Sequence, residues 1–97
     1  MEKLYRQGDV LLREVQKMPD TAKTSEDHIL VRGETTGHAH SASIQMQVFR
    51  TDEGGMFLQG PGQLLHQEHK TIQVPEGTFE VVRQKEYSPL ANHIVQD

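Results

Sequence analysis

Cysteine and tryptophan are absent from this chain of 97 residues, and its aromatic residues are limited to three Phe and two Tyr. The lack of cysteine excludes disulfides and thiolate metal ligands, and it fits a reducing cytoplasm, where we expect the protein to be located. The few aromatic side chains leave a lean core, which favours a sheet closed on itself or a subunit partner. This length suits one modest core, so we expect a single domain over residues 1–97.

Long apolar runs are also missing. None approaches the ~20 residues that a membrane helix needs, and residues 1–9 are polar, without the apolar region of a secretory signal. The formal net charge is −4, so the chain lacks the globally basic surface of proteins that bind long nucleic acid. We therefore expect neither a membrane nor long double-stranded nucleic acid as a partner. A small anionic ligand is compatible with local cations, for which the candidates are Arg32, Lys70, Arg83 and Lys85.

Glycine and proline recur at short intervals, a spacing that favours strands and turns over helices. The sequence predicts strands over residues 10–15, 28–32, 38–49, 56–58, 64–66, 71–74 and 78–85. It predicts turns or breaks at 7–9, 51–55, 60–62 and 75–77, and a loop over 18–27. Ser88-Pro89 can begin a short helix, or residues 94–95 can form a last edge strand. The predicted fold class is all-β: a small closed or nearly closed antiparallel β-barrel of about six or seven short strands.

The clearest strand pattern lies in residues 38–49. Positions 42, 44, 46 and 48 are apolar and alternate with polar positions, which is the period of a half-buried strand. His38 and His40 have the same parity as the apolar set. We therefore expect both imidazoles to point to the inner face of the strand.

Six histidines are present, and four of them form two tight clusters. His38 and His40 are spaced so that a strand presents both rings on one face. Neutral imidazole is a good ligand for zinc, iron, nickel or copper, and two imidazoles can also divide general base and general acid work. His28 and His93, outside the clusters, are interpreted as ordinary surface or core residues.

The second cluster, His66-Gln67-Glu68-His69, needs a particular backbone to act as a pair. In a strand, two residues three apart point to opposite faces, so these rings converge only in a turn or a single helical turn. Glu68 or Glu34 can orient a histidine by accepting its second N–H.

Two further segments each have a functional and an ordinary interpretation. The loop over residues 33–37 permits a close approach of ligand to backbone at Thr36 and Gly37, or it is a plain hairpin loop. Residues 83–87 provide Arg83 and Lys85 to hold a phosphate or carboxylate and Tyr87 to donate a hydrogen bond or proton. The alternative is a solvated strand end with surface ion pairs.

Four segments taken together resemble a family of small bacterial and phage-borne proteins that carry GExTGHxH, HxEH and RQxEYSP patterns in this order. The matching segments are residues 6–12, 33–40, 66–69 and 83–89. Small proteins of this type include ring nucleases, which degrade the cyclic oligoadenylate messengers of antiviral defence. The resemblance implies a role for His38, His40, His66, His69, Arg83 and Tyr87.

A second resemblance is to the cupin motifs, carried by Gly33 with His38 and His40, and then by residues 75–77. The glutamate expected after the first motif is absent, with Ile44 and Gln45 in its place. Glu80 stands where the second motif has histidine. A cupin-like metal site would therefore need His66 and His69 as replacement ligands.

Three functions follow. The first is a metal-independent phosphodiesterase in which one histidine activates a ribose 2′-OH, a second protonates the leaving oxygen, and Arg83 or Lys85 stabilises the phosphate. Its substrate would be a small cyclic oligonucleotide, and a homodimer would suit a symmetric ring. The second is a cupin-like barrel that holds a divalent metal such as Zn, Mn, Ni or Fe through His38, His40, His66 and His69. The third is an interaction or assembly module in which the histidines are incidental or sense pH.

Overall fold

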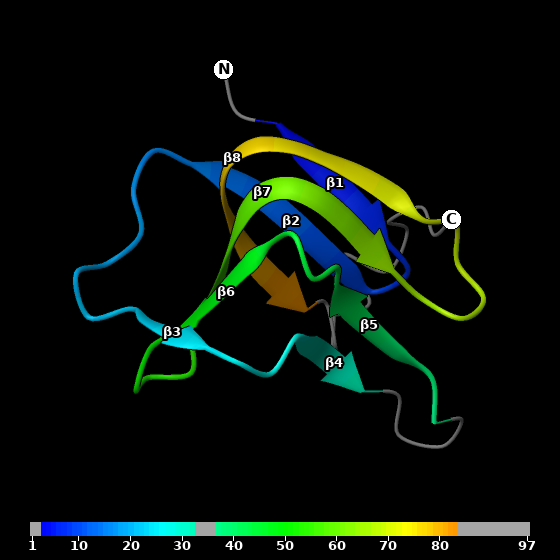
Figure 1. Ribbon diagram of the computed structural model, residues 1–97, viewed down its shortest axis with the longest axis horizontal. Helices are drawn as coiled ribbons and strands as arrows, with labels where there is room; N and C mark the ends of the chain where they lie inside the picture. The colour runs from blue at the N-terminus through cyan, green and yellow to red at the C-terminus, as the bar shows by residue number, and fades with distance from the viewer. Residues whose placement is uncertain (1–2, 33–36, 84–97) are drawn as a thin grey trace, which may run out of the picture.

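The computed structural model describes residues 3–32 and 37–83, which form eight strands joined in one sheet (Figure 1). They are β1 (Leu4–Gln7), β2 (Val10–Val15), β3 (Lys23–Ser25), β4 (Ile29–Arg32), β5 (Ala39–Ala42), β6 (Gln47–Arg50), β7 (Met56–Leu65) and β8 (Ile72–Arg83). Every strand pair is antiparallel. The described residues contain no helix, so the all-β prediction is confirmed.

The sheet follows the order β1-β2-β8-β7-β5-β4, and β6 also pairs with β7 and carries β3. Over the described residues, this path does not close on itself by backbone hydrogen bonds. The predicted strand over residues 10–15 is confirmed as β2, and the strand over 28–32 is observed as β4. The prediction missed β1 in the polar start of the chain and β3 inside the expected loop over 18–27. The count is eight because 38–49 also divides into β5 and β6, whereas 56–58 joins 64–66 as β7 and 71–74 joins 78–85 as β8.

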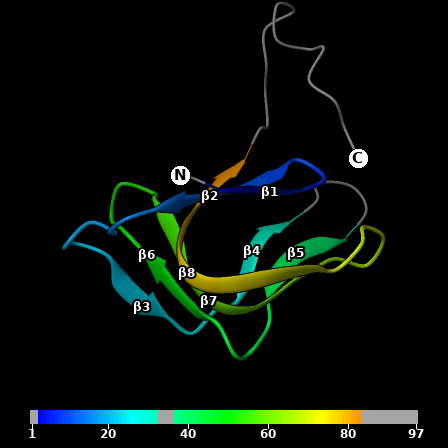
Figure 2. The same cartoon turned by 90° about the horizontal axis from the view of Figure 1, so that it is seen from above.

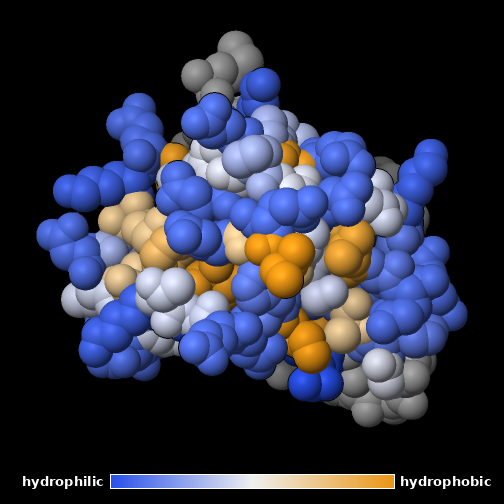
Figure 3. All heavy atoms as spheres, in the orientation of Figure 1, coloured by the Kyte–Doolittle hydropathy of each residue, from blue (hydrophilic) through white to orange (hydrophobic). Residues whose placement is uncertain are grey.

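The core lies between the two sides of the curved sheet. Phe79 and Leu58 are fully buried in its centre, and the ring of Tyr5 packs edge-on against Phe79. The buried apolar set comprises Val10, Leu12, Leu30, Ala42, Met46, Val48, Leu58, Leu64, Val74 and Phe79. On the face shown in Figure 3, apolar side chains reach the surface in small separate groups among hydrophilic ones.

The prediction of one continuous strand over residues 38–49 is wrong, because the chain turns between β5 and β6. Ile44 lies in this turn and is 90% exposed, although its parity predicted burial. The reason is that β5 and β6 pair with successive parts of the same edge of β7. Ser43 anchors the turn: its hydroxyl accepts from the backbone N–H of Gln63, and its own N–H donates to the Gln63 carbonyl.

The predicted breaks at 60–62 and 75–77 are also wrong, because β7 and β8 continue through them. Gly60 and Gly77 lie opposite each other in the pairing, and the register shifts just after Gly60. A Cβ on Gly60 would lie 2.0 Å from the Pro75 carbonyl oxygen, so the two strands bend together only without a side chain there. Both strands therefore curve around the core, and the β1–β2 hairpin lies across from β4 and β5 (Figure 2).

Some predictions lie outside the described residues. They are the loop residues 33–36, the end of the strand beyond Arg83, the helix start at 88–89 and the edge strand at 94–95. Among the residues that the structure covers, no helix has the length and apolar character needed to cross a membrane.

Candidate functional site

The β5–β7 register brings the two histidine clusters together. Ser41 pairs with Leu65 and Ala42 with Leu64, so the next position along places His40 opposite His66. Their ring centroids are 4.4 Å apart. The Ala39 backbone N–H donates to the Gln67 side chain at 2.9 Å and ties the start of β5 to the 66–69 bend.

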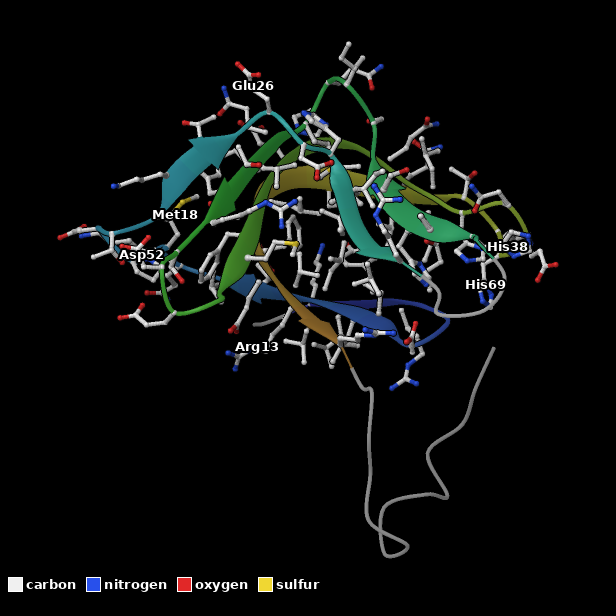
Figure 4. All side chains as sticks on the ribbon, turned by 90° about the horizontal axis from the view of Figure 1, so that it is seen from below. Arg13, Met18, Glu26, His38, Asp52 and His69 are labelled. Atoms are coloured by element: carbon white, nitrogen blue, oxygen red, sulfur yellow. The ribbon has the colours of Figure 1, made fainter. Side chains whose placement is uncertain are left out.

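The bend after β7 brings His69 into the same group. Its ring centroid lies 4.6 Å from that of His66 and 5.8 Å from that of His40. The sequence required a turn for this convergence, and residues 67–69 form a bend. His38, just before β5, lies 5.6 Å from His66 between ring centroids. His38 and His69 lie at the end of the molecule opposite Met18 and Asp52 (Figure 4).

The β1–β2 hairpin supplies the next two residues of the site. Gln7 pairs with Val10, so Gly8 and Asp9 form a two-residue turn. Gly8 has φ of 60°, a conformation that favours glycine at the first central position of a type II′ turn. A Cβ there would lie 2.7 Å from Nε2 of His69. Glycine therefore permits both the turn and the close approach of the histidine.

Gln7 sets the protonation of His40. Nε2 of Gln7 donates to the carbonyl oxygens of Leu64 and Lys70, at 3.0 and 2.8 Å. Both amide protons are then used, so Oε1 is the atom that faces Nδ1 of His40 at 2.8 Å. An amide oxygen only accepts, so Nδ1 of His40 carries a proton.

The other ring nitrogen of His40 faces a carboxylate. Nε2 lies 3.2 Å from Oδ1 of Asp9, and the His40 side chain is 6% exposed. The second oxygen of Asp9 accepts from Nε of Arg83 at 3.3 Å. A second proton on His40 would complete a charged hydrogen bond to Asp9, whereas a neutral ring presents its lone pair to the carboxylate.

His66 has the opposite arrangement. Its Nδ1 accepts from the backbone N–H groups of Glu68 and His69, at 3.0 and 3.1 Å. A nitrogen that accepts from two donors carries no proton, so the neutral ring of His66 carries its proton on Nε2. Burial lowers the pKa of His66, and the neighbouring charges of His69 and His38 lower it further against the opposing effect of Glu68 and Asp9.

These side chains line a cavity of about 210 Å³ at the edge of the sheet. The described residues that line it are Asp9, Val31, Arg32, His38, His40, His66, Glu68, His69 and Arg83. Glu68 approaches His38, with 3.7 Å between Oε2 and Nδ1. The cavity therefore combines four imidazoles with two carboxylates and two guanidinium groups.

Most of the residues that the sequence singled out and the structure describes line this cavity. The four clustered histidines, Arg83 and Arg32 line it, whereas the side chain of Lys70 is exposed and does not. Gly37 has φ of 77° and is exposed. His28 lies apart, its Nδ1 3.1 Å from the Ser43 carbonyl. Thr36, Lys85, Tyr87, Glu34 and His93 lie outside the described residues.

Sequence reasoning missed Gln7 and Asp9, which it interpreted only as turn residues. Gln7 is fully buried, and its two donated bonds and the one it accepts connect β1 to β7, Lys70 and β5. The signal that could have indicated it is a polar residue at the end of a strand directly before a glycine turn. Recognising that signal required the missed strand β1.

The cavity makes stability depend on pH. Burial lowers the pKa of His40, with further lowering by His66 and His69 and an opposing effect of Asp9. The pKa values of His40 and His66 in the folded state are thus below the ordinary histidine value of about 6.5. At a pH above that value, both histidines are neutral in the folded and in the unfolded chain, and the free energy of unfolding is not reduced by their titration. As pH falls below it, the unfolded chain takes up protons before the folded chain does, so the free energy of unfolding decreases.

We expect the melting temperature to fall when pH is lowered from about 7.5 to about 5.5. His66→Asn should reduce this fall, because the asparagine oxygen can accept the same two backbone N–H groups but does not titrate. Thermal unfolding at several pH values measures both slopes. An equal slope in the variant would show that His66 does not contribute.

Comparison with known proteins shows the family of this chain. A family model described as a domain of unknown function (DUF8820) matches residues 6–84, which include every described residue of the cavity. No curated protein matches the chain, and no solved structure does.

Proposed function

This chain belongs to the DUF8820 family, and from the chemistry of its histidine cavity we propose that it is a phosphodiesterase that cleaves RNA-type linkages without a metal ion. The observation that carries the proposal is the different protonation of neighbouring rings. His40 is arranged to hold a proton on Nδ1 and to exchange one on Nε2, whereas His66 is kept neutral. Acid–base catalysis needs such differences between adjacent groups.

His38 is the proposed general base. The carboxylate of Glu68 near its Nδ1 favours the tautomer with the proton on that nitrogen, and this leaves the lone pair on Nε2. In the proposed reaction His38 takes the proton of the ribose 2′-OH as this oxygen attacks the adjacent phosphorus.

His40 is the proposed general acid. In its doubly protonated form it donates one N–H to Gln7 and the other towards Asp9. Burial lowers the pKa of His40, so its imidazolium gives up a proton readily. That proton goes to the 5′-oxygen as the P–O5′ bond breaks. The products are a 2′,3′-cyclic phosphate and a free 5′-OH, with His38 protonated and His40 neutral.

Charge that builds on the phosphate needs donors that do not themselves react. The Nε2–H of His66 is one, because its neutral ring keeps this proton. Arg83 and Arg32 line the same cavity and supply positive charge. Donors of this kind, directed at the developing charge, make a large contribution to catalysis.

The proposal includes a substrate class, a location and an assembly. A small cyclic oligoadenylate suits a negatively charged chain better than long RNA does. Such a substrate is made inside cells, so the proposal includes a cytoplasmic location. A homodimer would present two cavities to a symmetric ring.

We also propose that the sheet forms a nearly closed barrel. Gln7 supports this closure because its side chain hydrogen-bonds from β1 to β7.

The test is cleavage of a cyclic oligoadenylate and of a linear adenylate dinucleotide in the presence of EDTA. We expect products that end in 2′,3′-cyclic phosphate, and we expect no cleavage of the 2′-O-methyl dinucleotide because its attacking hydroxyl is blocked. Chromatography with mass spectrometry identifies these products. Equal cleavage of the methylated substrate, or no cleavage of any substrate, would overturn the proposal.

A divalent metal site is the second candidate, favoured by one contact. When His40 is neutral, its Nε2 and Oδ1 of Asp9 face each other at 3.2 Å. An ion that lies to one side of the line joining them could be about 2.0–2.2 Å from each atom. The described residues hold no group of three or more donors already arranged around one point, and Nδ1 of His66 is occupied by backbone donors. Loss of activity in EDTA with recovery on adding one metal would favour this candidate.

A further inference from the structure

A second cavity adjoins the histidine cavity. It has a volume of about 520 Å³ and is lined by Asp27, Ile29, Leu30, Val31, Arg32, Gly54, Met56, Val81 and Arg83. Val31, Arg32 and Arg83 line both cavities. The two spaces are therefore neighbours that share one wall, and this wall carries two cations.

Size distinguishes the two cavities. Sites for small molecules measure about 300–1,000 Å³, and the histidine cavity, at about 210 Å³, is below that range. It has room for a phosphate and part of a sugar. The second cavity, at about 520 Å³, falls within the range. A nucleotide whose phosphate lay among the histidines would need such a space for the rest of its structure.

The chemistry of the second cavity suits a nucleobase. Ile29, Val31, Met56 and Val81 supply apolar contact for the faces of a flat ring, and the guanidinium planes of Arg32 and Arg83 can stack on it. The walls are strand edges. Within the described residues β4 pairs only with β5, and β8 pairs with β7 no further than Glu80. Backbone groups at such edges can hydrogen-bond to the polar edge of a base.

We propose that the second cavity is a nucleoside subsite, which holds the base on one side of the phosphodiester while the scissile phosphate lies among the histidines. This inference rests on the proposed function and extends it, because it assigns a binding place to the base of the nucleotide, which the proposed reaction does not require. The shared wall would then place Arg83 and Arg32 between phosphate and base.

The experiment titrates two probes into the full chain and follows NMR signals. Adenosine 3′-monophosphate carries a base, and ribose 5-phosphate carries only sugar and phosphate. Both are expected to shift the ring signals of the clustered histidines. Adenosine 3′-monophosphate alone is expected to shift the methyl signals of Ile29, Val31, Met56 and Val81, and to bind about tenfold more tightly.

A matched pair of variants tests the location of the subsite. Val81→Phe narrows the second cavity and is expected to remove the tenfold advantage of the adenosine probe while ribose 5-phosphate binds as before. Val82→Phe is the control, because the adjacent position on β8 points to the opposite face. Melting temperatures confirm that both variants are folded, and the methyl shifts of the wild-type chain test the site independently of either.

The outcomes separate this inference from the proposed function. If ribose 5-phosphate shifts the histidines but the adenosine probe binds no more tightly and leaves the four methyl groups unchanged, the subsite is wrong and the phosphodiesterase stands. An advantage of the adenosine probe that survives in Val81→Phe also overturns the subsite. If neither probe shifts the histidines, both proposals fail.

Discussion

Replacement of His38 by glutamine is expected to lower kcat/KM for cleavage of an RNA-type dinucleotide by about 10²–10⁴-fold, because it removes the general base. The side chain of His38 is 29% exposed, so the variant should fold with little change in melting temperature. Initial rates with the linear adenylate dinucleotide measure the loss.

Two comparisons make this result specific. His40→Gln removes the acid and should cost a similar factor, and the double variant should lose less than the product of the two single losses because the residues act as a unit. His28→Gln is the control, since His28 lies outside the cavity and contacts the Ser43 carbonyl. Unchanged activity in both His38→Gln and His40→Gln would remove the basis for the proposed mechanism.

The largest stability effect is expected from Gln7→Leu. The change removes three hydrogen bonds and leaves Nδ1 of the buried His40 and the Leu64 carbonyl without the Gln7 partner. We expect a loss of about 2–4 kcal/mol in the free energy of unfolding, which corresponds to a fall in melting temperature of roughly 10–20 °C for a domain of this size.

Gln47→Leu is the matched control for this change. Gln47 is an exposed residue of β6, so the same substitution there should alter the free energy of unfolding by less than about 0.5 kcal/mol. Chemical denaturation of both variants measures the difference. Equal stability of the two would mean that the hydrogen bonds of Gln7 to β5 and β7 do not stabilise the fold.

The all-β class was predictable from the sequence because it depends on local patterns. Short apolar segments bounded by turn residues predicted β2 and β4 closely. The errors arose where tertiary pairing overrides a local signal. Pro61 and Pro75 lie inside long strands because facing glycines allow β7 and β8 to bend together. Ile44 is exposed because β7 offers one edge to two strands.

The candidate site was predictable only in part, for a related reason. Spacing indicated that His38 and His40 share a side and that His66 and His69 need a turn. What joins the pairs is the β5–β7 register, which one sequence without pairing information does not reveal. Asp9 and Gln7 were missed because their roles arise from contacts with residues far away in the sequence. The one local signal, a polar residue directly before a glycine turn, depended on recognising β1.

The hydrogen bonds of Gln7 have a consequence for how the protein folds. They join residue 7 to residues 64 and 70, and to His40, so they close loops of 57, 63 and 33 residues. Long loops cost more chain entropy to close than short ones, and domains rich in distant contacts fold slowly. We therefore expect the cavity to be completed late in folding, when β1 reaches β5 and β7. Partly folded chains would then lack it, and the proposed chemistry would belong to the native state.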